Sequence, residues 1–467
     1  WASSPALPRP WDGRLHVHET PLAMAPLTPG LRAIALSWLA ESTLGVHLDL
    51  VLFKDRHPEA VCMDGTSSGY WWREATSEEG KSMWVVFLQS GGWCWDKASC
   101  AERKVHRPDL WSSDNWVRVM PASGLLSDTN EASPEYLRNA NKVFVGYCTS
   151  DAHMGNVAAF DLQFRGRKVI QAVLTDLIEV HGMGRRPNGK KDFLLFGGGS
   201  AGARGAMVYV DYVSKMLGDA AKDINVAGFL DSPLWIDVPP LKNFSVGNES
   251  LARQTKRIYD FANISILDDD CERAYPGEGW KCIFGEYRMP FIKTPYVMVA
   301  ALHDAFQLWW LAGGTPTSSW NELQLDFARR FADRTASAIQ SLRARGHFVI
   351  AEACNSHSEG LSDLGYFGHS TGRGVTMNSA VGLFMRDLAV AVGAPSGVGS
   401  FWVDDCRELN CGGGCHRCDN ANLSEHRCWE PTIYADVPQI DEINAAPAAA
   451  ASLLVIAAVA AQLISGL

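Results

Sequence analysis

Short apolar runs, each ending in small or polar residues, recur along the chain from Met83 onward. They are apolar throughout rather than alternating, which is typical of strands buried on both faces of a sheet. The expected strands are contained in SMWVVFLQ, NKVFVGYC, DFLLFGGG, INVAGFLD, PYVMVAAL and HFVIAEAC. Segments with apolar residues at helical spacing lie between most of them. This alternation predicts an α/β fold with a mostly parallel central sheet and helices on both faces.

The expected helices lie in RKVIQAVLTDLIEVHGM, in AGARGAMVYVDYVSKML and in a long segment after residue 316. Thr317 or Ser318 is expected to cap the last of these helices. In parallel α/β sheets, sites form beyond the carboxyl ends of the strands. Polar residues that directly follow an expected strand are therefore the first candidates for chemistry.

The chain is expected to divide into a loosely structured arm at 1–55, a main α/β domain at 56–430 with a Cys-rich end at 404–430, and a linker and apolar tail at 431–467. No charged residue follows Glu442, and the uncharged stretch is long enough to cross a bilayer. It resembles a GPI-attachment signal or a membrane span, and a disordered Ala-rich tail is the alternative. We expect membrane attachment through this tail.

Cysteines and sequons indicate the secretory pathway. The chain has 467 residues, twelve of them Cys, and four sequons begin at Asn243, Asn248, Asn263 and Asn422. In a reducing cytosol so many cysteines would require metal or redox chemistry, whereas a secreted glycoprotein uses them in disulfides. The spacing in the Cys-rich end fits no standard zinc pattern well, so disulfides are favoured over zinc, one of them reaching back to Cys354. The net charge of −10 comes with no basic stripe, so nucleic acid is not an expected partner.

The stretch from Gly198 to Gly202 fits the pattern G-x-S-x-G between an expected strand and an expected helix. Such a turn exposes Ser200 as a nucleophile and directs the N–H of Ala201 toward a developing oxyanion. A structural Gly-rich turn or a dinucleotide loop is the alternative, because the glycines also satisfy G-x-G-x-x-G numerically. A phosphate-binding P-loop would need Gly-Lys-Ser/Thr, which the turn lacks.

A serine nucleophile needs a base, and the base needs an orienting acid. His357 follows the last expected strand and is the favoured base; His303 competes with it, and His153 is expected to line the site. Asp304 follows a strand and precedes His357, which gives the chain order Ser, Asp, His. Asp231 also follows a strand, but is expected to fix its own loop together with Ser232.

A second oxyanion donor is expected in the loop SGGWCWDKASC, which follows the strand that begins at Met83. Glycine lets backbone N–H groups approach a substrate oxygen, and Gly91-Gly92-Trp93 supplies such groups. A disulfide between Cys94 and Cys100 is expected to close this loop into a small ring. A hairpin turn is the alternative, although no strand follows. Among the tryptophans, the Trp309-Trp310 pair is expected to reach the site.

The motifs together resemble the pectin acetylesterase/Notum family of extracellular carboxylesterases. The matching pieces run in order as MDGTSSGYWW, WVVFLQSGGWCWDKASC, VFVGYCTSD, FRGRKVIQAVLTDLI, LLFGGGSAGARGAM, ALHDAFQL, CNSHSEG and VDDCRELNCGGGC. The resemblance implies an α/β-hydrolase-like fold for the main domain, secretion and no cofactor or metal. It places the nucleophile on Ser200, the acid on Asp304 and the base on His357. The oxyanion donors it implies are Gly92, Trp93 and Ala201.

Family members remove acetyl groups from pectin or a palmitoleoyl group from Wnt proteins. For this chain the resemblance implies hydrolysis of an O-acyl ester, with an acetylated polysaccharide as the expected substrate. Removal of a fatty acyl group from a protein or lipid is the first alternative. A non-catalytic surface binding protein on the same fold is the alternative from another class.

Overall fold

The computed structural model describes residues 47–128, 133–186, 190–244, 249–265, 270–313, 317–343, 347–390 and 400–415. The predictions for the arm up to residue 46, for the tail, for Cys418 and Cys428 and for the sequons at Asn248 and Asn422 lie outside these residues. Within them, no helix combines the length and apolar character needed to span a membrane. The two other sequon asparagines, Asn243 and Asn263, are exposed.

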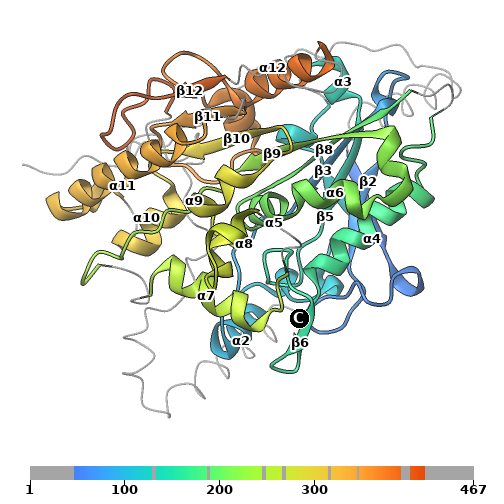
Figure 1. The fold of residues 1–467 in the computed structure, drawn as a ribbon, viewed down its shortest axis with the longest axis horizontal. Helices are drawn as coiled ribbons and strands as arrows, with labels where there is room; N and C mark the ends of the chain where they lie inside the picture. The colour runs from blue at the N-terminus through green and yellow to red at the C-terminus, as the bar shows by residue number, and fades with distance from the viewer. Residues whose placement is uncertain are drawn as a thin grey trace, which may run out of the picture. The chain divides into compact units, whose positions relative to one another are not determined.

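One large sheet runs through the described part of the chain (Figure 1). Its order is β12 (Phe401–Val403), β11 (Phe348–Glu352), β10 (Tyr296–Ala301), β9 (Ile224–Asp231), β8 (Asp192–Gly199), β3 (Met83–Leu88), β5 (Asn141–Val145), β2 (Gly69–Arg73), β1 (His47–Leu52) and β4 (Val119–Pro121). Neighbouring strands are parallel from β12 to β5. The pairs that add β2, β1 and β4 are antiparallel. The prediction of a mostly parallel sheet is therefore confirmed.

Helices cover both faces of the sheet, as predicted (Figure 1). One face packs on α4 (Gly166–Glu179), α5 (Ala201–Tyr209), α7 (Leu251–Phe261), α10 (Ala305–Ala312) and α11 (Glu322–Gln340). The other packs on α3 (Glu135–Arg138) and α12 (Met377–Val390). Successive residues of β3 alternate between the two cores: Val85 and Phe87 belong to one, and Val86 and Leu88 to the other. This burial on both sides explains why the strands are apolar throughout.

The described chain also contains smaller elements. They are α2 (Lys97–His106), α6 (Val213–Met216), α8 (Asp270–Ala274), α9 (Gly285–Arg288) and a hairpin of β6 (Val157–Ala159) and β7 (Leu162–Phe164).

Two boundaries differ from the predictions. The sheet begins at His47, inside the segment assigned to a loose arm, because β1 alternates Leu48, Leu50 and Leu52 with polar or smaller residues and pairs with β2. The helix predicted to start at Thr317 or Ser318 starts instead after Asn321. The Asn321 side chain accepts hydrogen bonds from the N–H groups of its own helix's first turn, and Thr317–Ser319 form a separate 3₁₀ turn.

Ten cysteines lie in the described residues and all are paired, as Cys62–Cys148, Cys94–Cys100, Cys271–Cys282, Cys354–Cys415 and Cys406–Cys411. This confirms the prediction of disulfides, including the small ring at Cys94 and the link from the Cys-rich end to Cys354. Such pairing is typical of a protein that folds in an oxidising compartment.

Candidate active site

Ser200 occupies a sharp turn between β8 and α5. Its φ of 49° and ψ of −115° lie outside the regions that L-residues prefer, and its N–H donates to the Asp231 carbonyl at 2.9 Å. Glycine is required two residues later, because a Cβ on Gly202 would lie 2.0 Å from the carbonyl oxygen of Leu88. Helix α5 thus packs directly against the end of β3, which holds the strained turn in place.

The structure brings Ser200, His357 and Asp304 together from three different strand ends. The Nε2 atom of His357 lies 2.7 Å from the Ser200 hydroxyl, and its Nδ1 lies 2.8 Å from Oδ2 of Asp304. The other Asp304 oxygen, Oδ1, accepts from the N–H of Gln307 at 2.9 Å and caps α10. All three side chains are buried. The carboxylate therefore fixes the imidazole so that its far nitrogen faces the hydroxyl.

Two opposing effects act on the His357 imidazole. Burial lowers its pKa, but the adjacent Asp304 carboxylate, together with the Asp231 and Glu359 carboxyl groups, outweighs burial and holds the pKa of His357 above its ordinary value. The ring of Phe306 lies 5.4 Å from the imidazole, centroid to centroid, and shields it on one side. An imidazole in these surroundings can take a proton from Ser200 and hold it beside an ionised partner.

The competing histidines are bound elsewhere. The Nε2 atom of His303 lies 3.1 Å from the carbonyl of Arg407. His153 lies with Nε2 3.0 Å from the carbonyl of Gln89 and stacks on Tyr147, and burial lowers its pKa to about 4. Neither ring shares a hydrogen bond with Ser200 in the described part of the chain.

Asp231 acts on its own surroundings, as predicted. Its carboxyl accepts from the Ser232 hydroxyl at 3.1 Å and from the N–H of Gly360 at 2.7 Å. The Ser232 hydroxyl in turn accepts from the N–H of Ser358, beside His357. Burial raises the pKa of Asp231 to about 7. These contacts hold the loop that carries the histidine.

The loop after β3 leads into α2 and not into a returning strand, which excludes the hairpin alternative. Gly92 has a φ of 62°, and its carbonyl accepts from the Tyr147 hydroxyl at 2.7 Å. The backbone N–H groups of Gly92, Trp93 and Ala201 have no acceptor among the described residues. An oxyanion requires backbone donors of this kind, so Gly92, Trp93 and Ala201 stay the predicted oxyanion donors.

Comparisons with known proteins identify the family of the chain. Residues 41–391 match the protein family described as Pectinacetylesterase. The chain belongs to the pectinacetylesterase family. Palmitoleoyl-protein carboxylesterase NOTUM of Drosophila melanogaster is 30% identical over 62% of this chain and 43% of its own length. Pectin acetylesterase 11 of Arabidopsis thaliana is 25% identical over 84% of this chain and 95% of its own.

The pectinacetylesterase fold has also been solved. The Wnt deacylase Notum from Drosophila superposes with a TM-score of 0.68 at 23% identity, covering 80% of this chain and 100% of that structure. The curated relatives are matched over unequal parts: notum2 of Xenopus laevis over 74% of its length, but the Drosophila NOTUM over less than half. The structural match shows an α/β-hydrolase fold, as predicted.

An aromatic wall beside the triad was not predicted from the sequence. We define it as Trp93, Arg204, Trp235 and Phe306. The Arg204 guanidinium carbon lies 3.6 Å from the Trp93 ring and 3.8 Å from the Trp235 ring. Trp235 stacks on Phe306 at 5.5 Å. The signal that was available is a charged residue, Arg204, among small and apolar residues four positions after Ser200.

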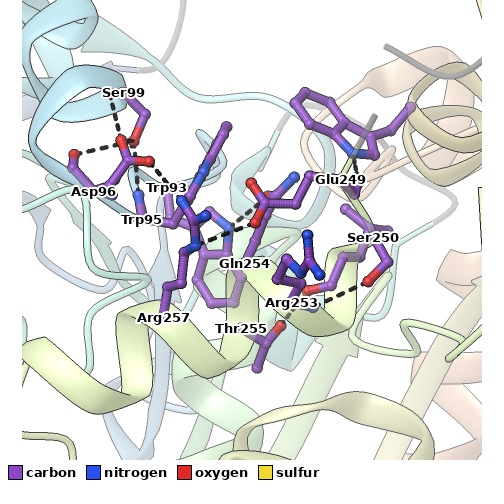
Figure 2. A network of polar contacts seen from close by, with 12 residues as sticks. Trp93, Trp95, Asp96, Ser99, Glu249, Ser250, Arg253, Gln254, Thr255 and Arg257 are labelled. Carbon is purple, nitrogen blue, oxygen red and sulfur yellow. Dashed lines mark hydrogen bonds and ion pairs between the residues drawn. The ribbon is translucent and has the colours of Figure 1, made fainter. Parts of the chain in front are cut away.

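Helix α7 braces the loop that carries Trp93 (Figure 2). Trp93 donates through Nε1 to the Gln254 amide oxygen at 3.3 Å. Arg257 lies one turn further and bonds Asp96, the N-cap of α2, at 2.8 Å. Of the predicted Trp309-Trp310 pair, Trp310 reaches this loop, since its ring packs against Trp95 at 5.6 Å.

The Cys-rich end supports the loop of His357. The Asp404 carboxylate accepts from the N–H of Ala353 at 2.9 Å, and the Asn410 side chain accepts from the N–H of Asn355 at 2.6 Å. Cys354, which lies between these two N–H donors in the sequence, forms a disulfide with Cys415. Thus the loop after β11 is held to the end of the described chain by both covalent and polar links.

Proposed function

We propose that this chain is a secretory-pathway serine carboxylesterase that acts through Ser200, His357 and Asp304. The observation that carries the proposal is the position of the His357 imidazole between a hydroxyl and a carboxylate, at 2.7 Å and 2.8 Å. A dinucleotide loop has no need of an imidazole against its serine. The printed names of the relatives, which include a carboxylesterase and an acetylesterase, support the same reaction class.

In the proposed reaction, His357 takes the Ser200 proton as the Ser200 oxygen attacks the ester carbonyl. The N–H groups of Gly92, Trp93 and Ala201 stabilise the oxyanion of the tetrahedral intermediate, each donor lowering the barrier by about 3 kcal/mol. His357 then gives its proton to the departing alcohol, which leaves an acyl group on Ser200. Water attacks this acyl-enzyme with the same base, releases the carboxylic acid and restores the serine.

The proposed substrate is an acetylated polysaccharide. Pectin acetylesterase 11 aligns over nearly its whole length, which favours this substrate class. The second candidate is removal of a fatty acyl group from a protein or lipid, and it is favoured by the names of the palmitoleoyl-protein carboxylesterases, which are more similar in sequence. A chain-length series of p-nitrophenyl esters separates the two, because a deep apolar pocket favours octanoate over acetate.

The first test is Ser200→Ala, with Ser150→Ala as its matched control. Ser150 is also buried, also has a positive φ of 46° and also follows a strand, but its hydroxyl donates to the Leu110 carbonyl. We expect Ser200→Ala to lose at least about 10⁴-fold in kcat on p-nitrophenyl acetate while Ser150→Ala retains activity. A fluorophosphonate probe should label Ser200 in the unchanged protein. Activity that survives in Ser200→Ala would sink the proposal, and an absence of labelling would favour a binding protein.

A further inference from the structure

A buried cation lies one helical turn beyond the proposed nucleophile. Arg204 follows Ser200 on α5, and its N–H donates to the Ser200 carbonyl at 3.0 Å, so both side chains leave neighbouring positions on one face of the helix. Only 1% of Arg204 is exposed. Its guanidinium carbon lies over both the Trp93 ring and the Trp235 ring, which meet edge to face at 74°. A charged group so close to the reacting serine, without a part in the triad, needs another role.

Polar contacts fix the Arg204 guanidinium, although no carboxylate among the described residues forms an ion pair with it. Its Nη2 donates to the carbonyl of Ile283 at 2.8 Å and lies 3.5 Å from the hydroxyl of Thr255. No carboxylate pairs with it among the residues that the structure describes. A buried ion without a counter-ion is costly, and two aromatic faces offset part of that cost through cation–π attraction. Moving the guanidinium away from these two rings would forfeit that compensation.

The aromatic wall reaches from the oxyanion loop to the base. At one end, Trp93 follows Gly92 in that loop; at the other, Phe306 packs on the His357 ring. In the tetrahedral intermediate the oxyanion faces the loop and the leaving alcohol faces His357. A large alcohol such as a polysaccharide must remain on the solvent side, so the acyl substituent is directed inward. Because the wall meets the site at the oxyanion loop and at His357, we place the inward acyl substituent against it; every member of the wall is at most 8% exposed.

Hydrogen-bond donors without acceptors lie in the wall and beside it. In the described part of the chain, the Nε atom of Arg204, the Nε1 atom of Trp235 and the Nε2 atom of Gln254 are buried and unpartnered. Gln254 joins the wall through its bond to Trp93, as Figure 2 shows. Unpaired donors disfavour contact with an alkyl chain, which can satisfy none of them.

We propose that Arg204 is the residue that limits acyl length at this site, closing the acyl pocket so that it accepts acetyl and rejects long alkyl chains. The inference rests on the proposed esterase function and names its acyl class. A fatty acyl chain would have to displace the guanidinium from both tryptophans or end against unpaired donors. An acetyl group is too short to reach the wall, so it neither displaces the guanidinium nor contacts the unpaired donors.

The test compares p-nitrophenyl acetate, butyrate and octanoate on the full chain and on three variants. In the unchanged protein, kcat/KM should fall from acetate to octanoate. Arg204→Ala opens space and should raise the octanoate-to-acetate ratio by about tenfold or more. Arg204→Met keeps most of the volume and should raise the ratio less. Arg288→Ala removes an equally buried guanidinium that bonds the Met207 carbonyl instead, and should leave the ratio unchanged.

The proposal is overturned if the unchanged protein prefers octanoate, or if folded Arg204→Ala and Arg204→Met both keep the original ratio. The first measurement needs no variant, so a variant that fails to fold does not remove the test. Failure of the esterase function itself looks different, because no ester would then be hydrolysed and a fluorophosphonate would not label Ser200. Labelling together with a preference for octanoate would overturn only the role of Arg204.

Discussion

The His357 imidazole shows how one residue's surroundings set its chemistry. Burial alone lowers the pKa of an imidazole, yet the pKa of His357 is raised because the Asp304 carboxylate lies against its Nδ1. His153, equally buried but bonded only to a backbone carbonyl, has a pKa lowered to about 4. The pKa of a histidine is therefore raised at one strand end and lowered to about 4 at another.

This difference predicts the pH dependence of the proposed esterase. His357 must be unprotonated to act as a base, so activity should fall as the pH drops through its pKa. Because that pKa is raised, the acid limb of kcat/KM should lie above about pH 6.5, the ordinary value for histidine. In Asp304→Asn the limb should move to lower pH, and kcat should fall by about 10⁴-fold. A pH profile of p-nitrophenyl acetate hydrolysis checks both, and an acid limb below pH 6 in the unchanged protein would contradict the assignment.

The sequence predicted which three residues meet at the candidate site, whereas their catalytic roles stay a prediction. Ser200 is recognisable from its strand, turn and helix, and Asp304 and His357 from the ends of apolar strands. Arg204 was not predicted, because its role depends on Trp93 and Trp235, which come from two other loops. Periodicity and motifs depend on the spacing of residues close together in the sequence. They do not predict which aromatic rings from distant loops pack on the Arg204 guanidinium.

At the scale of elements, the close approach of α5 to β3 decides the geometry of the nucleophile turn. The parallel strands from β3 to β11 were predictable, because burial on both faces leaves uninterrupted apolar runs. The antiparallel edge formed by β1 and β4 and the covering helices α7 and α12 were not identified. Their patterns are short or mixed, and their positions are set by the sheet on which they pack.

The α5–β3 contact predicts a severe effect of Gly202→Ala. The new Cβ would meet the Leu88 carbonyl at 2.0 Å, and backbone on both sides leaves little room to yield. We expect a loss of roughly 3 kcal/mol or more in the free energy of unfolding, with loss of activity. Gly413→Ala is the control, since its Cβ would meet nothing closer than 3.5 Å. Urea unfolding of both variants measures the difference, and equal stabilities would show that the turn does not need this contact.

At the scale of the whole molecule, disulfides connect distant parts of the described chain. Cys354–Cys415 spans 61 residues and begins three residues before His357, whereas Cys271–Cys282 spans 11 residues in the region of α8. Loop-closure entropy favours the longer link, worth about 4 kcal/mol against about 3 kcal/mol. Cys354–Cys415 also lies closer in sequence to His357, the proposed base, than Cys271–Cys282 does.

The paired substitutions Cys354→Ser with Cys415→Ser should lower both the melting temperature and kcat. The pair Cys271→Ser with Cys282→Ser should lower the melting temperature less and leave kcat nearly unchanged. Thermal unfolding and hydrolysis of p-nitrophenyl acetate check the two expectations together. Equal losses of kcat in both pairs would show that the Cys-rich end does not position His357.

The order of the proposed catalytic residues along the chain bears on when the site can form. His357 lies 157 residues after Ser200 and 53 after Asp304. During synthesis the serine therefore emerges from the ribosome long before its partner does. Until β11 takes its place at the edge of β10, the imidazole is not held beside the Ser200 hydroxyl, which remains an ordinary alcohol. The pairing of β11 with β10 is therefore the step that assembles the proposed site.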